Sequence, residues 1–250
     1  MGYRIKDNTP RVRMFAGPNG SGKSTIKSMI DRELIGIYIN PDEMELEIRD
    51  RGFLDLAYYQ VQTTREEILG FFSQADLLKQ SDLMDEVDYL RFGDEKLIFH
   101  DVGVVNSYFA SVAADFIRMK LLELRKSFSF ETVMSHPSKV ELLDLAKQLG
   151  YRTYLYFIAT EDPTINISRV QFRVEHGGHS VPKEKMIERY KRSIELLMLA
   201  IHSSNRAYIF DNSREQPIWI AEITDGKALE TKTEELPFWF KRAVGDRLKY

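Results

Sequence analysis

Apolar residues along this chain follow two alternating patterns. Short, mostly apolar runs bounded by glycine, proline or polar residues predict β-strands at 11–16, 36–40, 127–133, 152–160 and 206–213. Segments in which apolar residues recur every three or four positions predict helices at 24–34, 137–150 and 182–202. A last β-rich run turns at Asp225-Gly226 and predicts a hairpin at an antiparallel edge. Because strands and helices alternate, we expect a mainly parallel, five-stranded α/β sheet covered by helices.

One region departs from the alternation. Residues 50–106 predict a helical insert, and its part from 76 to 101 is rich in acidic residues, among them Asp82, Asp85, Glu86 and Asp88. We interpret this acidic part as a solvated helix face, with a lid or a partner-docking element as the alternative. The run KLIFHD at 96–101 within it is typical of either a small strand or a buried turn. The predicted organisation is a single domain over 1–250, with this insert and a C-terminal hairpin and tail over 214–250.

The segment between the first predicted strand and the next helix carries a phosphate-binding pattern. It fits Gly-x-x-x-x-Gly-Lys-Ser, in which backbone N–H groups turn inward around phosphate oxygens. Lys23 reaches the β and γ phosphates, and the Ser24 hydroxyl ligates Mg²⁺. We therefore expect ATP and Mg²⁺ as cofactors on a P-loop NTPase three-layer sandwich of the kinase type. The predicted nucleotide-binding residues of this loop are Gly17, Pro18, Asn19, Gly20, Ser21, Gly22, Lys23, Ser24 and Thr25.

Composition narrows the function classes. The chain has 250 residues, of which 43% are hydrophobic and 29% charged, a balance typical of a soluble globular protein. The formal net charge of −3 indicates no strong basic field, so no nucleic-acid partner is expected. There is no cysteine, which excludes disulfides and thiolate metal sites and fits a cytoplasmic protein. The sequence holds no apolar run of membrane-spanning length, so no membrane partner is expected.

Ligands of parallel sheets bind at the carboxyl ends of the strands, so polar residues there are candidates for the site. Asp42 follows the second strand, where a carboxylate can orient an acceptor hydroxyl and take its proton; the alternative is a cap on the next helix. Glu131 and Thr132 end the third strand. Glu131 suits support of Mg²⁺ or a hydrogen bond to the substrate, and the alternative is a buried polar pair.

The segments after the fourth and fifth strands supply further candidates. Arg169 and Arg173 are four residues apart on a predicted helix, and a guanidinium suits the charge of a transferring phosphate. His179 lies in a glycine-rich stretch that predicts a hinged lid. Asp211 and Asn212 end the fifth strand and are expected to contact the nucleotide. Asp211 competes with Glu131 for the metal-supporting role, and Glu131 is preferred.

Together these pieces resemble the zeta-toxin family of P-loop kinases. The resemblance rests on AGPNGSGKST, YINPDE, FSFETVMSH, the run from FIATEDP through GGHSVP to RYKRS, and IFDNS. It implies ATP and Mg²⁺ at Lys23 and Ser24, a general base at Asp42 and a lid arginine at Arg173. It also implies that Glu131 and Thr132 lie in the substrate-binding segment. Toxins of the family phosphorylate UDP-N-acetylglucosamine and are held inactive by an antitoxin protein.

The sequence therefore predicts an ATP-dependent kinase that transfers the γ-phosphate to a hydroxyl of a small molecule, with a UDP-sugar among the candidate acceptors. Lys23, Asp42 and Arg173 are its predicted catalytic residues, and Arg169 and His179 join Glu131 and Thr132 on the substrate. An antitoxin is a candidate partner. The alternative function is an ATPase or nucleotide switch that acts on a partner protein, with the acidic insert as its docking surface.

Overall fold

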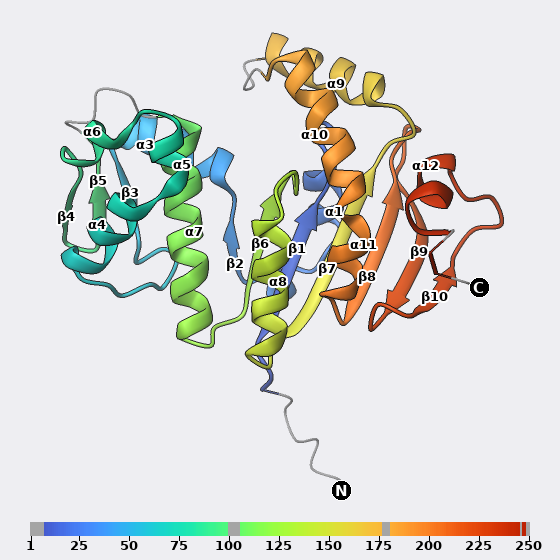
Figure 1. Ribbon diagram of the computed structural model, residues 1–250, viewed down its shortest axis with the longest axis horizontal. Helices are drawn as coiled ribbons and strands as arrows, with labels where there is room; N and C mark the ends of the chain where they lie inside the picture. Colours follow the sequence, from blue (N-terminus) through green and yellow to red (C-terminus); the bar gives the residue numbers. More distant parts are fainter. Residues whose placement is uncertain (1–7, 100–105, 177–180, 246, 249–250) are drawn as a thin grey trace, which may run out of the picture. The chain divides into compact units, whose positions relative to one another are not determined.

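A computed structural model describes residues 8–99, 106–176, 181–245 and 247–248 (Figure 1). The chain divides into two compact units. The core unit comprises Met1–Gly36 and Ser129–Tyr250, and the insert unit comprises Ile37–Phe128. The insert unit is therefore wider than the segment 50–106 that breaks the sequence pattern.

The core unit is built on a sheet in which its strands follow the order β10-β9-β8-β7-β1-β6. Their bounds are β1 Arg11–Ala16, β6 Phe128–Thr132, β7 Arg152–Ala159, β8 Arg206–Asp211, β9 Ile218–Thr224 and β10 Ala228–Thr231. β1 pairs parallel with β7, and β7 pairs parallel with β8. β9 and β10 continue the sheet antiparallel, as the predicted hairpin requires. The mainly parallel α/β fold is confirmed.

Helices of the core unit pack against this sheet, and α8 and α11 both contact β7 (Figure 1). α9 and α10 pack on each other through an apolar cluster centred on Ile167, Val170 and Met186. The helices are α1 Lys23–Ser28, α2 Arg32–Ile35, α8 Ser138–Gln148, α9 Pro163–Glu175, α10 Lys183–Glu195, α11 Leu197–His202 and α12 Phe238–Phe240, followed by the π-helical turn η1 Lys241–Gly245.

Two predicted helices are each divided in the structure. The helix expected over 24–34 ends at Ser28, because Asp31 caps a second short helix by accepting a hydrogen bond from the Glu33 N–H at 3.0 Å. The apolar stripe expected there is consequently incomplete, since Met29 and Leu34 are 60% and 50% exposed. The segment 182–202 forms α10 and α11 with a break at Leu196.

The insert unit combines helices with a small sheet. Its strands β3, β5 and β4 form a three-stranded antiparallel sheet, in which β5 is the small strand offered for KLIFHD and the other two strands were missed by the helical prediction for 50–106. Asp82, Asp85 and Asp88 are exposed, as the solvated-face interpretation expects. Its elements are β2 Ile37–Ile39, α3 Pro41–Arg51, β3 Phe53–Asp55, α4 Arg65–Gln74, α5 Asp76–Gln80, α6 Met84–Val87, β4 Arg91–Gly93, β5 Lys96–Ile98 and α7 Ser107–Glu123.

The helices within the described ranges were also compared with the length and apolarity that a bilayer requires. None of them is both long enough and apolar enough to cross a membrane. The longest, α7, has 17 residues and carries charged residues such as Asp115 and Arg118.

Candidate active site

The predicted phosphate loop connects β1 to α1, which is the strand–loop–helix arrangement that the motif requires. Lys23 is the first residue of α1, and Gly22 occupies the N-cap position in a left-handed conformation. The Gly17 N–H donates to the Thr132 carbonyl at 3.3 Å, which ties the start of the loop to the end of β6. The N-terminal N–H groups of α1 therefore face the position where a phosphate would bind.

The Lys23 ammonium is buried beside the loop. Its Nζ donates to the carbonyl oxygens of Gly17 at 2.9 Å and Pro18 at 3.1 Å, and it lies 3.8 Å from Glu131 Oε1. The two side chains are only 8% and 13% exposed, so the ion pair is largely shielded from water. β6, which carries Glu131, is the neighbour of β1 in the sheet. The structure thus brings the predicted carboxylate to the predicted phosphate-binding lysine.

Thr132 lies next to Glu131 at the end of β6. Its carbonyl accepts from Gly17, and its hydroxyl accepts a hydrogen bond from the Met134 N–H at 2.9 Å. The carbonyl thus joins the phosphate loop to the end of β6, whereas the hydroxyl fixes the turn that follows the strand. Its predicted contact with the substrate stays a prediction.

The opposite side of the loop is bounded by residues that follow β8. Asn212 Nδ2 donates to the Ser21 carbonyl at 2.8 Å. The Arg169 guanidinium donates to the carbonyl oxygens of Asn212 at 2.8 Å and Arg214 at 3.0 Å. Arg169 therefore lies with the segment after β8, whereas Thr132 lies at the end of β6, and the strand order puts β8 and β6 on opposite sides of β1. The predicted contact of Arg169 with the substrate stays a prediction.

Asp211, which was expected to contact the nucleotide, has structural partners. Its Oδ1 accepts hydrogen bonds from the Trp239 indole at 2.8 Å and the Ser213 hydroxyl at 2.8 Å. Its Oδ2 accepts from the Ser213 N–H at 3.2 Å. Because the indole donor comes from α12, Asp211 ties the C-terminal segment to the end of β8.

Asn166 is a residue of the site that sequence reasoning missed. It lies on α9, is 2% exposed, and its Nδ2 donates to the Asn19 carbonyl at 2.7 Å. Its Oδ1 is hydrogen-bonded by the Thr160 hydroxyl at the end of β7. The signal that indicates it is an amide on the buried face of a helix, three residues before Arg169, where an apolar residue is the usual occupant.

Arg173 is exposed on α9, one helical turn beyond Arg169. The next helix, α10, carries Tyr190, whose hydroxyl donates to the Thr160 carbonyl at 2.6 Å. Burial raises the pKa of this phenol. The α9–α10 pair is thus fixed to the end of β7. His179, predicted on the substrate, lies outside the described residues.

Asp42 belongs to the insert unit and lies in the first turn of α3. Of the two interpretations of Asp42, a general base or a helix cap, the structure decides the second. The cap of this helix is Asn40, whose side chain accepts a hydrogen bond from the Asp42 N–H at 3.1 Å. The Asp42 residue itself is exposed. Its role as a general base stays a prediction, and a capping role is excluded by the cap that Asn40 supplies.

Ser24 is the predicted magnesium ligand of the phosphate loop. Ser24 is exposed in the first turn of α1, directly after Lys23. In the described ranges no group of three or more His, Cys, Asp or Glu side chains is placed to hold a metal ion. An exposed hydroxyl suits Mg²⁺, which retains waters and takes phosphate oxygens as ligands, and the role of Ser24 as a magnesium ligand stays a prediction.

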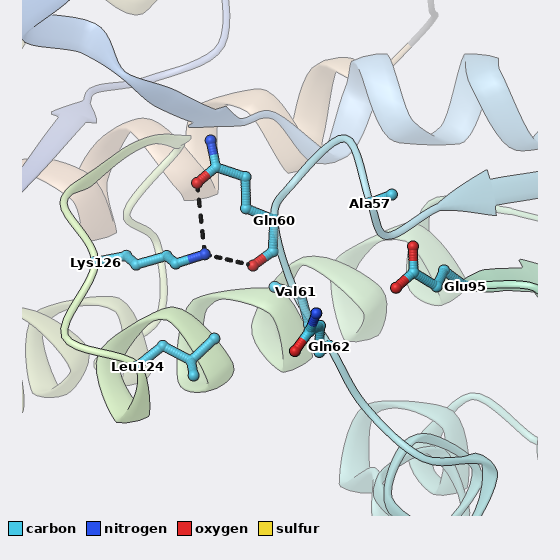
Figure 2. Close-up of a pocket in the computed structure, with 7 residues that line it drawn as sticks. All are labelled: Ala57, Gln60, Val61, Gln62, Glu95, Leu124 and Lys126. Atoms are coloured by element: carbon cyan, nitrogen blue, oxygen red, sulfur yellow. Dashed lines mark hydrogen bonds between the residues drawn. The ribbon is translucent and has the colours of Figure 1, made fainter.

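Two surface pockets of about 360 Å³ each contain no residue of the phosphate loop. One lies within the insert unit. There Lys126 Nζ donates to the main-chain carbonyl of Gln60 at 2.8 Å and to the side-chain Oε1 of Gln60 at 3.4 Å (Figure 2). The other includes Arg152 and Arg206, which begin β7 and β8. These strands begin at the edge of the sheet opposite to the one where the phosphate loop follows β1, so this pocket is separate from the candidate site.

Comparison with known proteins decides the family. The family model described as Zeta toxin matches residues 94–222, which is about half of the chain. The chain belongs to the zeta toxin family. An uncharacterised protein of Haemophilus influenzae is 23% identical to this family member over 184 residues, covering 70% of the chain and 89% of that protein.

Solved structures show the same fold. The AvrRxo1-ORF1:AvrRxo1-ORF2 structure with sulphate ions matches with a TM-score of 0.57 at 12% identity, covering 96% of this zeta toxin family member and 65% of that chain. The AvrRxo1-ORF1:-ORF2 structure with ATP matches with a TM-score of 0.52 at 12% identity, covering 90% of the present chain and 61% of that chain. The present chain thus spans less than two thirds of these solved chains. Family and loop together support a nucleotide-dependent kinase.

Proposed function

We propose that this zeta toxin family member transfers the γ-phosphate of ATP to a hydroxyl of a small molecule. The observation that carries the proposal is the buried pair of Lys23 and Glu131, with the two charged atoms 3.8 Å apart at the phosphate loop. A carboxylate at this point supplies an acid that can support a metal or an acceptor beside the transferring phosphate. Glu131 comes from the strand next to the loop, on the side away from Asn212 and Arg169.

This two-sided arrangement supports different roles for the ends of β8 and β6. The segment after β8, with Asn212 and Arg169, would lie toward the nucleoside, and the end of β6 would lie toward the acceptor. ATP would be held by the backbone N–H groups of the loop and by Lys23, which exchanges a loop carbonyl for a phosphate oxygen. Ser24 would ligate Mg²⁺, whose charge offsets that of the phosphates.

On the acceptor side, catalysis would be positioning and electrostatic stabilisation, as phosphoryl transfer requires. Asp42 would orient the acceptor hydroxyl and accept its proton. Arg173 would neutralise charge that develops on the transferring phosphate, and Glu131, Thr132 and His179 would contact the acceptor. The exposed position of Asp42 in the first turn of α3 supports its part, because a ligand can reach the carboxylate there.

For the acceptor, we propose a sugar nucleotide such as UDP-N-acetylglucosamine, the class that the family resemblance implies. We also propose a protein partner that restrains the enzyme. The solved AvrRxo1-ORF1 structures contain AvrRxo1-ORF2 as a second protein, and that likeness supports a partner of the same kind.

Transfer of radiolabel from γ-labelled ATP tests the proposal. Wild type is offered UDP-sugars, other sugar nucleotides and NAD, beside Lys23→Ala, Asp42→Asn and the control Asp50→Asn, another exposed acid of α3. We expect label on one acceptor, lost in Lys23→Ala and Asp42→Asn and kept in the control. Label that appears only as free phosphate and survives Asp42→Asn would instead support the ATPase or switch function.

A further inference from the structure

Two asparagine amides contact the outer side of the phosphate loop. Asn166 Nδ2 donates to the Asn19 carbonyl at 2.7 Å, and Asn212 Nδ2 donates to the Ser21 carbonyl at 2.8 Å. The two amides come from different elements, α9 and the segment after β8. Both residues are buried, at 2% and 6% exposure. The loop is therefore held at alternate peptide groups from two directions.

Peptide geometry gives these contacts a consequence for the opposite side of the loop. A trans peptide is planar, and its C=O and N–H bonds point in opposite directions. The Asn19 carbonyl shares its plane with the Gly20 N–H, and the Ser21 carbonyl shares its plane with the N–H of Gly22. An amide that holds each carbonyl outward therefore turns the following N–H inward, toward the phosphates.

The glycines of the motif are needed for this close approach. A Cβ on Gly20 would lie 2.5 Å from the Asn166 carbonyl oxygen, and a Cβ on Gly22 would lie 2.2 Å from Asn212 Nδ2. Both glycines have positive φ, 74° and 96°, which side chains disfavour. Glycine at these positions thus admits the two asparagines as well as the phosphate.

The amides are themselves held in place. The Thr160 hydroxyl bonds to Asn166 Oδ1, which orients the Nδ2 toward the loop. The Asn212 main chain is fixed by its N–H, which donates to the Ala159 carbonyl at 2.8 Å, and by Arg169, which donates to its carbonyl. Each donor therefore has a defined direction before any ligand binds, which lowers the cost of ordering the site.

We propose that Asn166 and Asn212 are positioning residues that set the affinity of the loop for a triphosphate by turning the Gly20 and Gly22 N–H groups inward. This inference rests on the proposed function only in that the loop binds a triphosphate. It makes α9 part of the phosphate site, since this helix supplies both Asn166 and the Arg169 that supports Asn212.

The test measures binding of inorganic tripolyphosphate by calorimetry, because this probe has neither base nor acceptor. The variants are Asn166→Leu, which removes the donor at similar volume, and Asn166→Asp and Asn212→Asp. Asn205→Asp is the control, since Asn205 also donates through its amide, to Asp225, at the far end of β8. We expect about tenfold weaker binding in each test variant, the factor for one lost hydrogen bond, and wild-type binding in the control.

A second readout separates positioning from a merely structural role. When the pH is lowered until the carboxyl of Asn166→Asp is protonated, the acid regains a donor, so its affinity relative to wild type should recover, while that of Asn166→Leu should not. Wild-type affinity in the variants would overturn the positioning role while leaving the kinase proposal intact. The positioning role would also be overturned if the weaker binding were fully explained by partial unfolding of the variant, measured as a lower melting temperature. If wild type binds neither tripolyphosphate nor ATP, both proposals fail.

Discussion

The hydrogen bond between Trp239 and Asp211 provides a stringent test of how the core unit is held together. The indole N–H donates to Asp211 Oδ1 at 2.8 Å, and the two residues are 5% and 6% exposed. The Trp239 ring packs on Phe157 with 6.1 Å between ring centroids. Trp239→Phe keeps an aromatic ring against Phe157 and removes the donor, while the hydrogen bonds from Ser213 to the Asp211 carboxylate remain.

The expected loss follows from this geometry. A hydrogen bond to a charged group contributes about 1.5–3 kcal/mol, and its loss leaves a buried carboxylate less well solvated. We therefore expect Trp239→Phe to lower the free energy of unfolding by about 2–3 kcal/mol. Asp211→Asn keeps an oxygen acceptor but removes the charge, so its own cost should be smaller, about 1 kcal/mol.

Urea denaturation of wild type, both single variants and the double variant measures the coupling between the two residues. We expect a coupling energy of about 1–2 kcal/mol, because each substitution removes part of the same interaction. A coupling below about 0.5 kcal/mol would refute the reasoning, since independent sites add within that margin. The affinity for ATP should be unchanged in Trp239→Phe, and a large loss would instead return Asp211 to the nucleotide-binding role expected from the sequence.

Two further predictions concern turns and caps of the core unit. Hydrogen bonds from the Thr164 side chain and N–H lower the pKa of Asp162, which caps α9. Asp162→Ala should therefore cost about 1 kcal/mol near neutral pH, and the difference from wild type should shrink as the pH falls below about 4, measured by thermal unfolding across pH. Gly226 has φ 69°, and a Cβ there would lie 2.9 Å from the Cα of His202. Gly226→Ala should lower the melting temperature, whereas the control Gly70→Ala, in α4 with nothing within 4 Å of the added Cβ, should raise it; an equal shift in both would contradict the local explanation.

Strands were easier to predict from this sequence than helix boundaries. The runs predicted over 11–16, 127–133 and 206–213 contain the strands β1, β6 and β8, and Asp225-Gly226 forms the expected hairpin turn. The helix after the phosphate loop was predicted too long, because periodicity does not detect that Asp31 begins a new helix with its own cap. Two strands of the small sheet of the insert unit, β3 and β4, were missed because they have only three residues each.

Local chemistry in the sequence determined the phosphate loop, the strand order along the chain and the candidates at the strand ends, since a Gly-rich loop and apolar periodicity depend on neighbouring residues. Only tertiary structure decided which candidates meet. It paired Glu131 with Lys23 across 108 positions of sequence. It also bonded Arg169 to the segment after β8, and Asp211 to Trp239 of α12. It also revealed Asn166, whose amide reaches a loop carbonyl 147 residues away. The physical reason is that hydrogen bonds and ion pairs between distant segments depend on how the strands are ordered in the sheet. Apolar periodicity along the chain does not determine that order.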